Sequence, residues 1–275
     1  MSFGGQVFAY PESPDRFYAI VGGRLKVPVI YEDQHVIAFE DASDDDTTRV
    51  TIIPRDPISS IAALDFSDAI RWLGMLTAIR AVPGHFGWGH DEGFRVDTPV
   101  HPPYQKQPWL CMHLSRSKSK ALKGEADEHG YTRDIGHFAE IVQLRRRVEV
   151  VYANDEFMVF HDFEDEDNAE YDHVLVGIPR RQVTTIMDDE FTPQDWLSLI
   201  GGIRETATRL NIPAYTTYMN VRPPYQHTAW VHVHLLAGGK ALEVGERKKD
   251  HDKEHDRKER KDKGKDHKGA APDAA

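Results

Sequence analysis

The chain has a single cysteine, Cys111, among its 275 residues. It therefore has no internal disulfide and no zinc site built from cysteines, and this usage fits a reducing compartment. The sequence also lacks a basic and apolar leader, and no stretch approaches the roughly 20 apolar residues of a membrane-spanning helix. We expect a soluble protein of the cytoplasm or nucleus with no membrane partner.

Positive charge is scarce outside the C-terminal tail. The net charge is −11, and residues 246–275 hold eleven Lys and Arg against nine Asp and Glu, so the tail is +2 and the rest is −13. An acidic body is a poor general nucleic-acid binder, because binding to phosphates depends on Lys and Arg. It leaves room for a small basic pocket that holds one nucleotide. The tail has almost no apolar residues to bury, so we expect it to be disordered; a solvated helix or weak metal binding by its histidines is the alternative.

An internal repeat dominates the rest of the sequence. Four blocks recur in the same order, and the first and last of them recur at an offset of 121 positions. Tandem copies of one domain of about 100 to 120 residues are therefore predicted, a common domain size. The paired blocks are 29–41 with 150–162, 52–61 with 177–186, 66–82 with 191–207, and 102–114 with 223–235.

Each copy predicts an α+β domain. Short β-rich runs come first, an amphipathic helix follows at 67–82 or 192–210, and further strands follow the helix. Ser67 and Thr192 are expected N-caps. We expect an antiparallel sheet with one main helix on its face in each copy. The predicted divisions are an N-terminal extension (1–25), a first domain (26–125), a second domain (126–245) and the tail (246–275).

Two histidines lie in an apolar strand of the second copy. In Trp230-Val-His232-Val-His234-Leu, alternate side chains share one face of a strand, so the tryptophan and both histidines lie together while the intervening residues face the core. An ordinary polar sheet face would look the same. A metal site is disfavoured because no third ligand of suitable type is near in sequence, and we expect no metal or other cofactor.

The surrounding blocks resemble the histidine triad superfamily of nucleotide hydrolases and transferases. Its motif, His-φ-His-φ-His-φ-φ with φ apolar, aligns with 230–236, where Trp230 replaces the first histidine. VVYANDEFMVFHDF, DHVLVGIPRR and TTYMNVRPPYQ are similar to the other conserved blocks of that family, with Gly177 as a one-residue insertion. Because histidine triad proteins form two-fold dimers with joined sheets, the resemblance implies that the two copies pair as a pseudo-dimer within one chain.

The resemblance also implies roles for individual residues. His232 would attack the α-phosphorus of a nucleotide to form a nucleotidyl-imidazole, His234 would donate to phosphate oxygens, and His173 would reach the site from the neighbouring strand. Trp230 cannot accept a hydrogen bond or relay a proton; it would pack in the fold or stack on a base. The nucleotide-binding positions implied are Asp162 (at the ribose), Phe163, Asn220, Gln226, His227 (a proton donor to the leaving group, or an exposed loop residue) and Trp230.

The first copy is eroded, since Cys111 stands where the second copy has His232 and only His113 is retained. Three functions follow from the resemblance. The leading one is a hydrolase or nucleotidyl transferase acting on dinucleoside polyphosphates, phosphoramidates or a cap-like dinucleotide. The alternative is a non-catalytic nucleotide-binding or scaffold protein. The galactose-1-phosphate uridylyltransferase branch also has tandem halves, but its His-Pro-His motif and metal are not found here.

Overall fold

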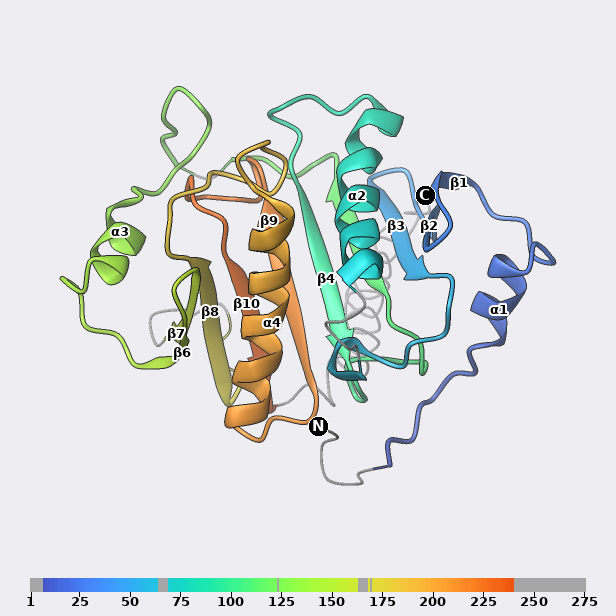
Figure 1. Cartoon of the computed structure of the whole chain (residues 1–275). Coiled ribbons are helices and arrows are strands. Elements are labelled where there is room, and N and C mark those ends of the chain that lie inside the picture. The colour runs from blue at the N-terminus through green and yellow to red at the C-terminus, as the bar shows by residue number, and fades with distance from the viewer. Residues whose placement is uncertain (1–6, 64–68, 123, 163–167, 169, 240–275) are drawn as a thin grey trace, which may run out of the picture. The chain divides into compact units, whose positions relative to one another are not determined.

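One continuous antiparallel sheet of ten strands organises the molecule (Figure 1). The computed structural model describes residues 7–63, 69–122, 124–162, 168 and 170–239; the predicted cap Ser67 and the tail lie outside them. The strand order is β1-β2-β3-β5-β4-β9-β10-β8-β7-β6. Going inward from either edge, the corresponding strands of the two copies follow in the same order. All described strands and helices belong to one compact unit, Met1–Gly238. The expected joining of two half-sheets within one chain is confirmed.

Apart from one 3-10 turn in the first half, the described parts of the two halves contain the same elements at corresponding positions. The first half has α1 (Asp15–Val21), β1 (Val29–Glu32), β2 (Val36–Glu40), β3 (Thr47–Pro54), a 3-10 turn (Ile61–Ala63), α2 (Ala69–Phe86), β4 (Phe94–Val100) and β5 (Met112–Ser117). The second half has α3 (Gly136–Val142), β6 (Val150–Ala153), β7 (Phe157–His161), β8 (His173–Pro179), α4 (Pro193–Arg209), β9 (Tyr215–Val221) and β10 (Val233–Ala237).

The two long helices cover one face of the sheet. α2 packs on β1 to β3 and α4 on β6 to β8, and the two helices touch each other. Thr192 begins α4 with a reciprocal capping box that it forms with Asp195, and such caps are typically worth about 1 kcal/mol. One large apolar core lies beneath the two helices and includes Trp72, Trp196 and Leu235.

The short helices α1 and α3 cover the opposite face at its two outer ends. Phe17 and Ile20 of α1 pack on a cluster that contains Trp109. Ile141 and Phe138 of α3 pack on an equivalent cluster that contains Trp230. Phe17 and Phe138 are 121 positions apart, as are the two tryptophans, so α1 is the counterpart of α3. Part of the stretch expected as an N-terminal extension thus belongs to the repeated architecture.

The halves meet along β4 and β9, which pair over seven residues from Phe94–Val221 to Val100–Tyr215. A second junction lies on the helix side. Arg80 of α2 donates to the carbonyl oxygens of Ile186 (2.7 Å), Asp188 (3.0 Å) and Phe191 (2.7 Å) in the second half. One side chain therefore holds a loop of the other half through charged hydrogen bonds.

Replacing Arg80 with methionine should lower the free energy of unfolding by about 2 kcal/mol, because three carbonyls lose a charged donor while the aliphatic stem is retained. Urea unfolding followed by tryptophan fluorescence measures the change. Arg209→Met, which removes an arginine that is half exposed and paired with Glu205 on α4, should change it by no more than about 0.5 kcal/mol. Equal effects of the two substitutions would contradict the bridging role of Arg80.

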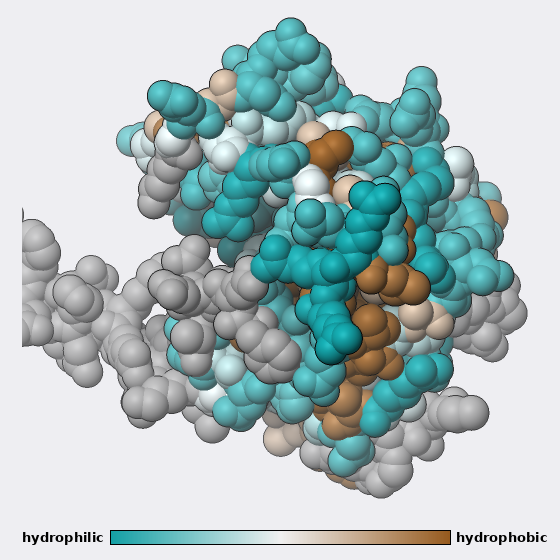
Figure 2. All heavy atoms as spheres, turned by 90° about the vertical axis from the view of Figure 1, so that its left-hand side faces the viewer, coloured by the Kyte–Doolittle hydropathy of each residue, from teal (hydrophilic) through white to brown (hydrophobic). Residues whose placement is uncertain are grey.

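The edge of the sheet at β6 is partly apolar at the surface. Figure 2 shows a band of apolar atoms among hydrophilic ones on this side of the molecule, where Leu144 is 77% exposed and Val150 is 44% exposed. Residues 145–147 are three arginines that lie between them in sequence. Charge beside an edge strand discourages pairing with another sheet.

Candidate active site on the sheet face opposite the long helices

The two motif histidines lie on the sheet face that the long helices leave uncovered. His234 on β10 pairs with Val176 of β8 and Tyr218 of β9. Its neighbours Val233 and Leu235 point into the main core. His232 directly precedes β10, and its ring centre is 5.3 Å from that of His234. The alternation expected for this strand is confirmed.

The backbone fixes which nitrogen of His232 carries its proton. Nδ1 lies 2.8 Å from the carbonyl oxygen of Trp230. A carbonyl can only accept, so Nδ1 carries the hydrogen and Nε2 of the neutral ring keeps its lone pair. Burial lowers the pKa of His232, which favours this neutral form at pH 7. No hydrogen bond occupies Nε2 within the described residues.

Phe138 of α3 limits access to His232. Its ring centre lies 5.5 Å from that of His232, and only 8% of His232 is exposed. Phe138 therefore shields the ring of His232 from solvent.

His234 is held by an aromatic stack. Its ring lies parallel to that of Tyr218, with 4.3 Å between centres and 4° between planes. Burial lowers the pKa of His234 well below its usual value, and the charges of His232, Arg95 and Arg133 lower it further. The neutral ring still has one N–H, so His234 can donate one hydrogen bond to a phosphate oxygen without being a cation.

Of the predicted nucleotide contacts, Asn220 lies near this pair. Asn220 is half-buried on β9, two residues beyond Tyr218 and on the same face. Because β9 and β10 are antiparallel, Asn220 lies beside the position of His232 as Tyr218 lies beside His234. Asp162 follows β7, and its backbone N–H donates to the carbonyl of Val174 at 2.9 Å. The neighbouring position expected to contribute, Phe163, lies outside the described residues.

His173 does not join the pair, contrary to the sequence expectation. It begins β8 opposite Ala237, in a register that runs without a bulge to Gly177 opposite Val233. His173 and every second residue after it on β8 point toward the long helices, whereas Val174 and Val176 share the face of His234. The ring of His173 instead lies 6.4 Å from that of His161. The extra Gly177 is accommodated within the regular strand, and this moves the histidine to the other face.

Gln226 shapes a loop and does not offer its amide to a ligand. Its side-chain nitrogen donates to the carbonyls of Thr184, Thr228 and Trp230, and its oxygen accepts from the N–H of Arg222 at 2.9 Å. Gln105 makes the same set of contacts in the first half. A contact set repeated in the eroded half indicates an architectural role.

Trp230 is a core residue. It is 4% exposed, its Nε1–H donates to the carbonyl of Pro179 at 3.1 Å, and its ring packs edge-on against Phe138. Trp109 makes the equivalent bond to Pro54 at 3.0 Å. The structure therefore supports the packing interpretation and leaves no open ring face for a base.

His227 lies in the loop before β10. Its Nδ1 is 2.8 Å from the hydroxyl of Thr132, and its carbonyl accepts from the N–H groups of Thr132 and Arg133. Its charge contributes to lowering the pKa of His232. It is thus anchored within electrostatic range of the proposed nucleophile.

The corresponding site of the first half is occupied by its own side chains. Arg16 makes two bonds to Asp41, which also accepts from the hydroxyl of Thr51. His113 lies 3.1 Å from that hydroxyl and 3.3 Å from Cys111 Sγ. Burial raises the pKa of the Cys111 thiol to about 12, so it is not a nucleophile at neutral pH. The expectation of an inert cysteine is consistent with this geometry.

Sequence reasoning missed three neighbours of the pair: Tyr218, Phe138 and Arg95. Tyr218 and Arg95 reach the histidines through strand register, and Phe138 through a helix in the link between the copies. Only the 121-residue offset of Phe17 and Phe138, both in short apolar segments, could have indicated the covering helix.

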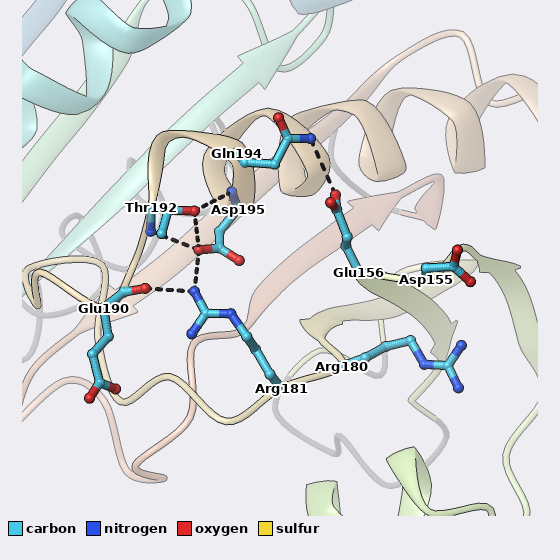
Figure 3. A pocket seen from close by; sticks show the side chains of 8 residues that line it. All are labelled: Asp155, Glu156, Arg180, Arg181, Glu190, Thr192, Gln194 and Asp195. Carbon is cyan, nitrogen blue, oxygen red and sulfur yellow. Dashed lines mark hydrogen bonds and ion pairs between the residues drawn. The ribbon is translucent and has the colours of Figure 1, made fainter.

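Two surface hollows lie elsewhere. One is lined by residues near the start of α4 (Figure 3), where Arg181 points at Asp195 and donates to the carbonyl of Glu190 at 2.6 Å. The other lies beside α2 and includes His35. Both are shallow, and the first is lined by four carboxylates and two arginines, so it is acidic and does not suit a phosphate. Within the described ranges, no group of three or more His, Cys, Asp or Glu residues is arranged to hold a metal, and no helix there is long and apolar enough to cross a membrane.

The buried imidazoles predict that stability falls in acid. The folded-state pKa values of His232 and His234 are lowered, while an unfolded histidine titrates near ~6.5. The unfolded state therefore binds more protons below about pH 6.5, so the stability present above this pH is lost as the pH falls. Urea midpoints should drop between pH 7 and pH 5. The double variant His232→Gln/His234→Gln should reduce this drop, whereas His90→Gln, at an exposed site, should not.

No family model and no curated relative matches the sequence. Solved structures share its fold. An ADP-glucose phosphorylase from Arabidopsis thaliana with bound ADP-glucose is 11% identical with a TM-score of 0.57, over 88% of this chain and 84% of that one. A GalT-like protein from Arabidopsis thaliana is 12% identical with a TM-score of 0.56, over 80% and 82%. A uridylyltransferase mutant is 11% identical with a TM-score of 0.52, over 75% and 77%.

These matches span both halves of the chain, so they concern the joined pair and not one copy. The uridylyltransferase branch, disfavoured from the sequence because its His-Pro-His motif and metal are not found, nevertheless includes structures with this architecture. Together with the mirrored strand order, the comparisons show that the chain shares the joined two-half fold of these structures.

Proposed function

We propose that the second half is a nucleotidyl transferase or hydrolase that uses His232 as its nucleophile. The observation that carries this proposal is the bond from His232 Nδ1–H to the Trp230 carbonyl. It leaves Nε2 unprotonated in a ring whose pKa is lowered by burial. An unprotonated and oriented nitrogen is what attack on phosphorus requires.

The proposed reaction has two displacements. The lone pair of Nε2 attacks the α-phosphorus, and the bond from phosphorus to the leaving group breaks with its electron pair on the leaving oxygen or nitrogen. In the second step, water or another acceptor attacks phosphorus and gives up its proton to the base that protonated the leaving group, and the imidazole leaves with its electron pair. His227 is the candidate proton donor to the leaving group, since it is anchored by Thr132 near His232.

The substrate's charged part would lie over the histidine pair. The N–H of neutral His234 and the amide of Asn220 would donate to phosphate oxygens, and fixed donors of this kind supply much of the catalysis of phosphoryl-type transfer. Asp162, at the end of β7, would accept from ribose hydroxyls. The phosphorylase of similar fold holds ADP-glucose, which adds nucleotide sugars to the candidate substrates.

The test is a substrate panel. The full chain would be incubated with dinucleoside polyphosphates, nucleoside phosphoramidates and ADP-glucose, and nucleoside monophosphate release would be followed by chromatography. The Cys111→Ala variant, altered at the equivalent site of the first half, should turn over the same substrates at the same rate. Complete absence of turnover across the panel would contradict the proposal.

A non-catalytic nucleotide-binding protein is the second candidate. It is favoured by the 8% exposure of His232 beneath Phe138 and by the separation of His173 from the pair. Calorimetry with nucleoside monophosphates distinguishes the two functions: binding without turnover of any panel member supports this second candidate.

A further inference from the structure

The site of the second half contains a part supplied by the first. β4 of the first half pairs with β9 of the second, so that Arg95 lies opposite Asn220 and Asp97 lies opposite Tyr218. Paired residues of an antiparallel ladder point to the same face. Arg95 therefore lies on the face that carries His234.

The guanidinium of Arg95 lies over the ring of Tyr218. Its guanidinium carbon is 3.9 Å from the centre of the Tyr218 ring, and its Nε–H donates to Asp97 at 2.8 Å. The Asp97 carboxylate thus orients the guanidinium. A cation at this distance over an aromatic face is attracted by about 0.5 to 2 kcal/mol.

His234 occupies the other face of the same ring. It lies 4.3 Å from Tyr218 in a parallel stack, and one ring face cannot hold both groups at these distances. Arg95, Tyr218 and His234 therefore form a three-layer stack that crosses the junction of the halves. Summing 3.9 Å and 4.3 Å sets the guanidinium about 8 Å from the imidazole centre.

The stack runs in one direction only. At an offset of 121 positions, the counterpart of Arg95 is Thr216 and the counterpart of Tyr218 is Asp97. At the position that corresponds to Arg95, the second half therefore has a hydroxyl in place of a cation. The same three-layer stack is therefore not repeated by the corresponding residues of the other half.

Resting on the proposed function, we infer that Arg95 of the first half is a positioning residue for His234: through Tyr218 it sets the plane of the imidazole that would donate to the phosphate. A supporting group that fixes a donor within a fraction of an ångström is what preorganised sites require. Under this inference the first half is part of the active unit and is more than a scaffold.

The charge of Arg95 gives the inference an independent readout. The groups around His234 are His232 on its own strand segment, Tyr218 on β9, Arg95 and Asp97 on β4, and Arg133 in the link between the halves. Arg95 disfavours protonation of His234, and so its loss should make His234 easier to protonate. At about 8 Å and an effective dielectric near 20, Coulomb's law sets the rise in pKa at no more than about 1.5 units.

The first experiment is an NMR titration of imidazole resonances in the full chain. Arg95→Met should raise the pKa of His234, and Arg95→Lys should retain most of the original value. Arg49→Met, which removes a first-half arginine paired with Asp44, should leave it unchanged. Tyr218→Leu should remove the ring-current shift of the His234 protons, and Tyr218→Phe should keep it. If Arg95→Met leaves both the pKa and the shift as in the wild type, the inference is overturned.

The second experiment measures turnover. Arg95→Met should lower kcat by about tenfold, with partial recovery in Arg95→Lys, because misplacing a donor to the phosphate costs about this much or more. If turnover depends on His232 but is the same in Arg95→Met and Arg49→Met, the inference fails while the proposed function stands. If no turnover is found at all, the proposed function fails and the NMR titration alone decides whether Arg95 positions His234.

Discussion

Replacing His232 with alanine should lower kcat by a factor of about 10⁴ or more on any substrate that the chain turns over. The side chain supplies the nucleophilic electron pair, and removing a nucleophile leaves only binding and fixed donors to accelerate the reaction. His232 makes one backbone hydrogen bond through Nδ1, so the substitution removes little structure. Product release measured under single-turnover conditions gives the factor.

Two variants serve as controls for this loss. His113→Ala alters the histidine at the equivalent of His234 in the first half, and it should retain turnover within about twofold. His234→Ala should fall between the two, since one donor to phosphate is typically worth about 10² to 10³ in kcat. If His232→Ala and His113→Ala lose activity equally, chemistry at Nε2 of His232 is not the source of turnover.

Replacing Trp230 with alanine should lower the free energy of unfolding by about 3 to 5 kcal/mol, the usual cost of emptying a large buried aromatic site. The ring is 4% exposed and packs with Phe138, Ile178 and their neighbours beneath α3. Denaturant unfolding would measure the loss. Trp109→Ala should cost a similar amount, because Trp109 fills the same position beneath α1.

Trp230→Phe separates packing from hydrogen bonding. It keeps an aromatic ring and leaves the carbonyl of Pro179 without its donor, so the expected cost is about 1 to 2 kcal/mol. If Trp230→Ala instead unfolds at the wild-type denaturant concentration and loses nucleotide affinity, the residue contacts the base and its core assignment is wrong.

The doubled α+β fold was predictable because hydrophobic patterns survive where identities do not. The blocks around Phe39 and Phe160 keep a strand alternation at an offset of 121, and the strands formed as expected. The membership of α1 in the repeat was harder to detect. Only a few apolar positions of α1, such as Phe17 and Ile20, match those of α3, and most of the other residues of the two helices differ.

The candidate site was predictable where a single strand decided the geometry. His232 and His234 share a face because side chains alternate along a strand, which needs no knowledge of neighbours. His173 was expected at the pair but lies on the other face of the sheet. One extra residue, Gly177, reverses the face on which the preceding side chains lie unless a bulge compensates, and the sequence does not show which occurs. Tyr218 and Arg95 were missed because their positions depend on the register between the two halves.

The most direct measurement is mass spectrometry of the chain quenched during turnover of a slow substrate. A nucleotidyl adduct carried by the peptide that contains His232, absent from His232→Ala, is the predicted result. Turnover with the adduct on another residue, or with no covalent species at any quench time, would contradict the central claim that Nε2 of His232 attacks phosphorus.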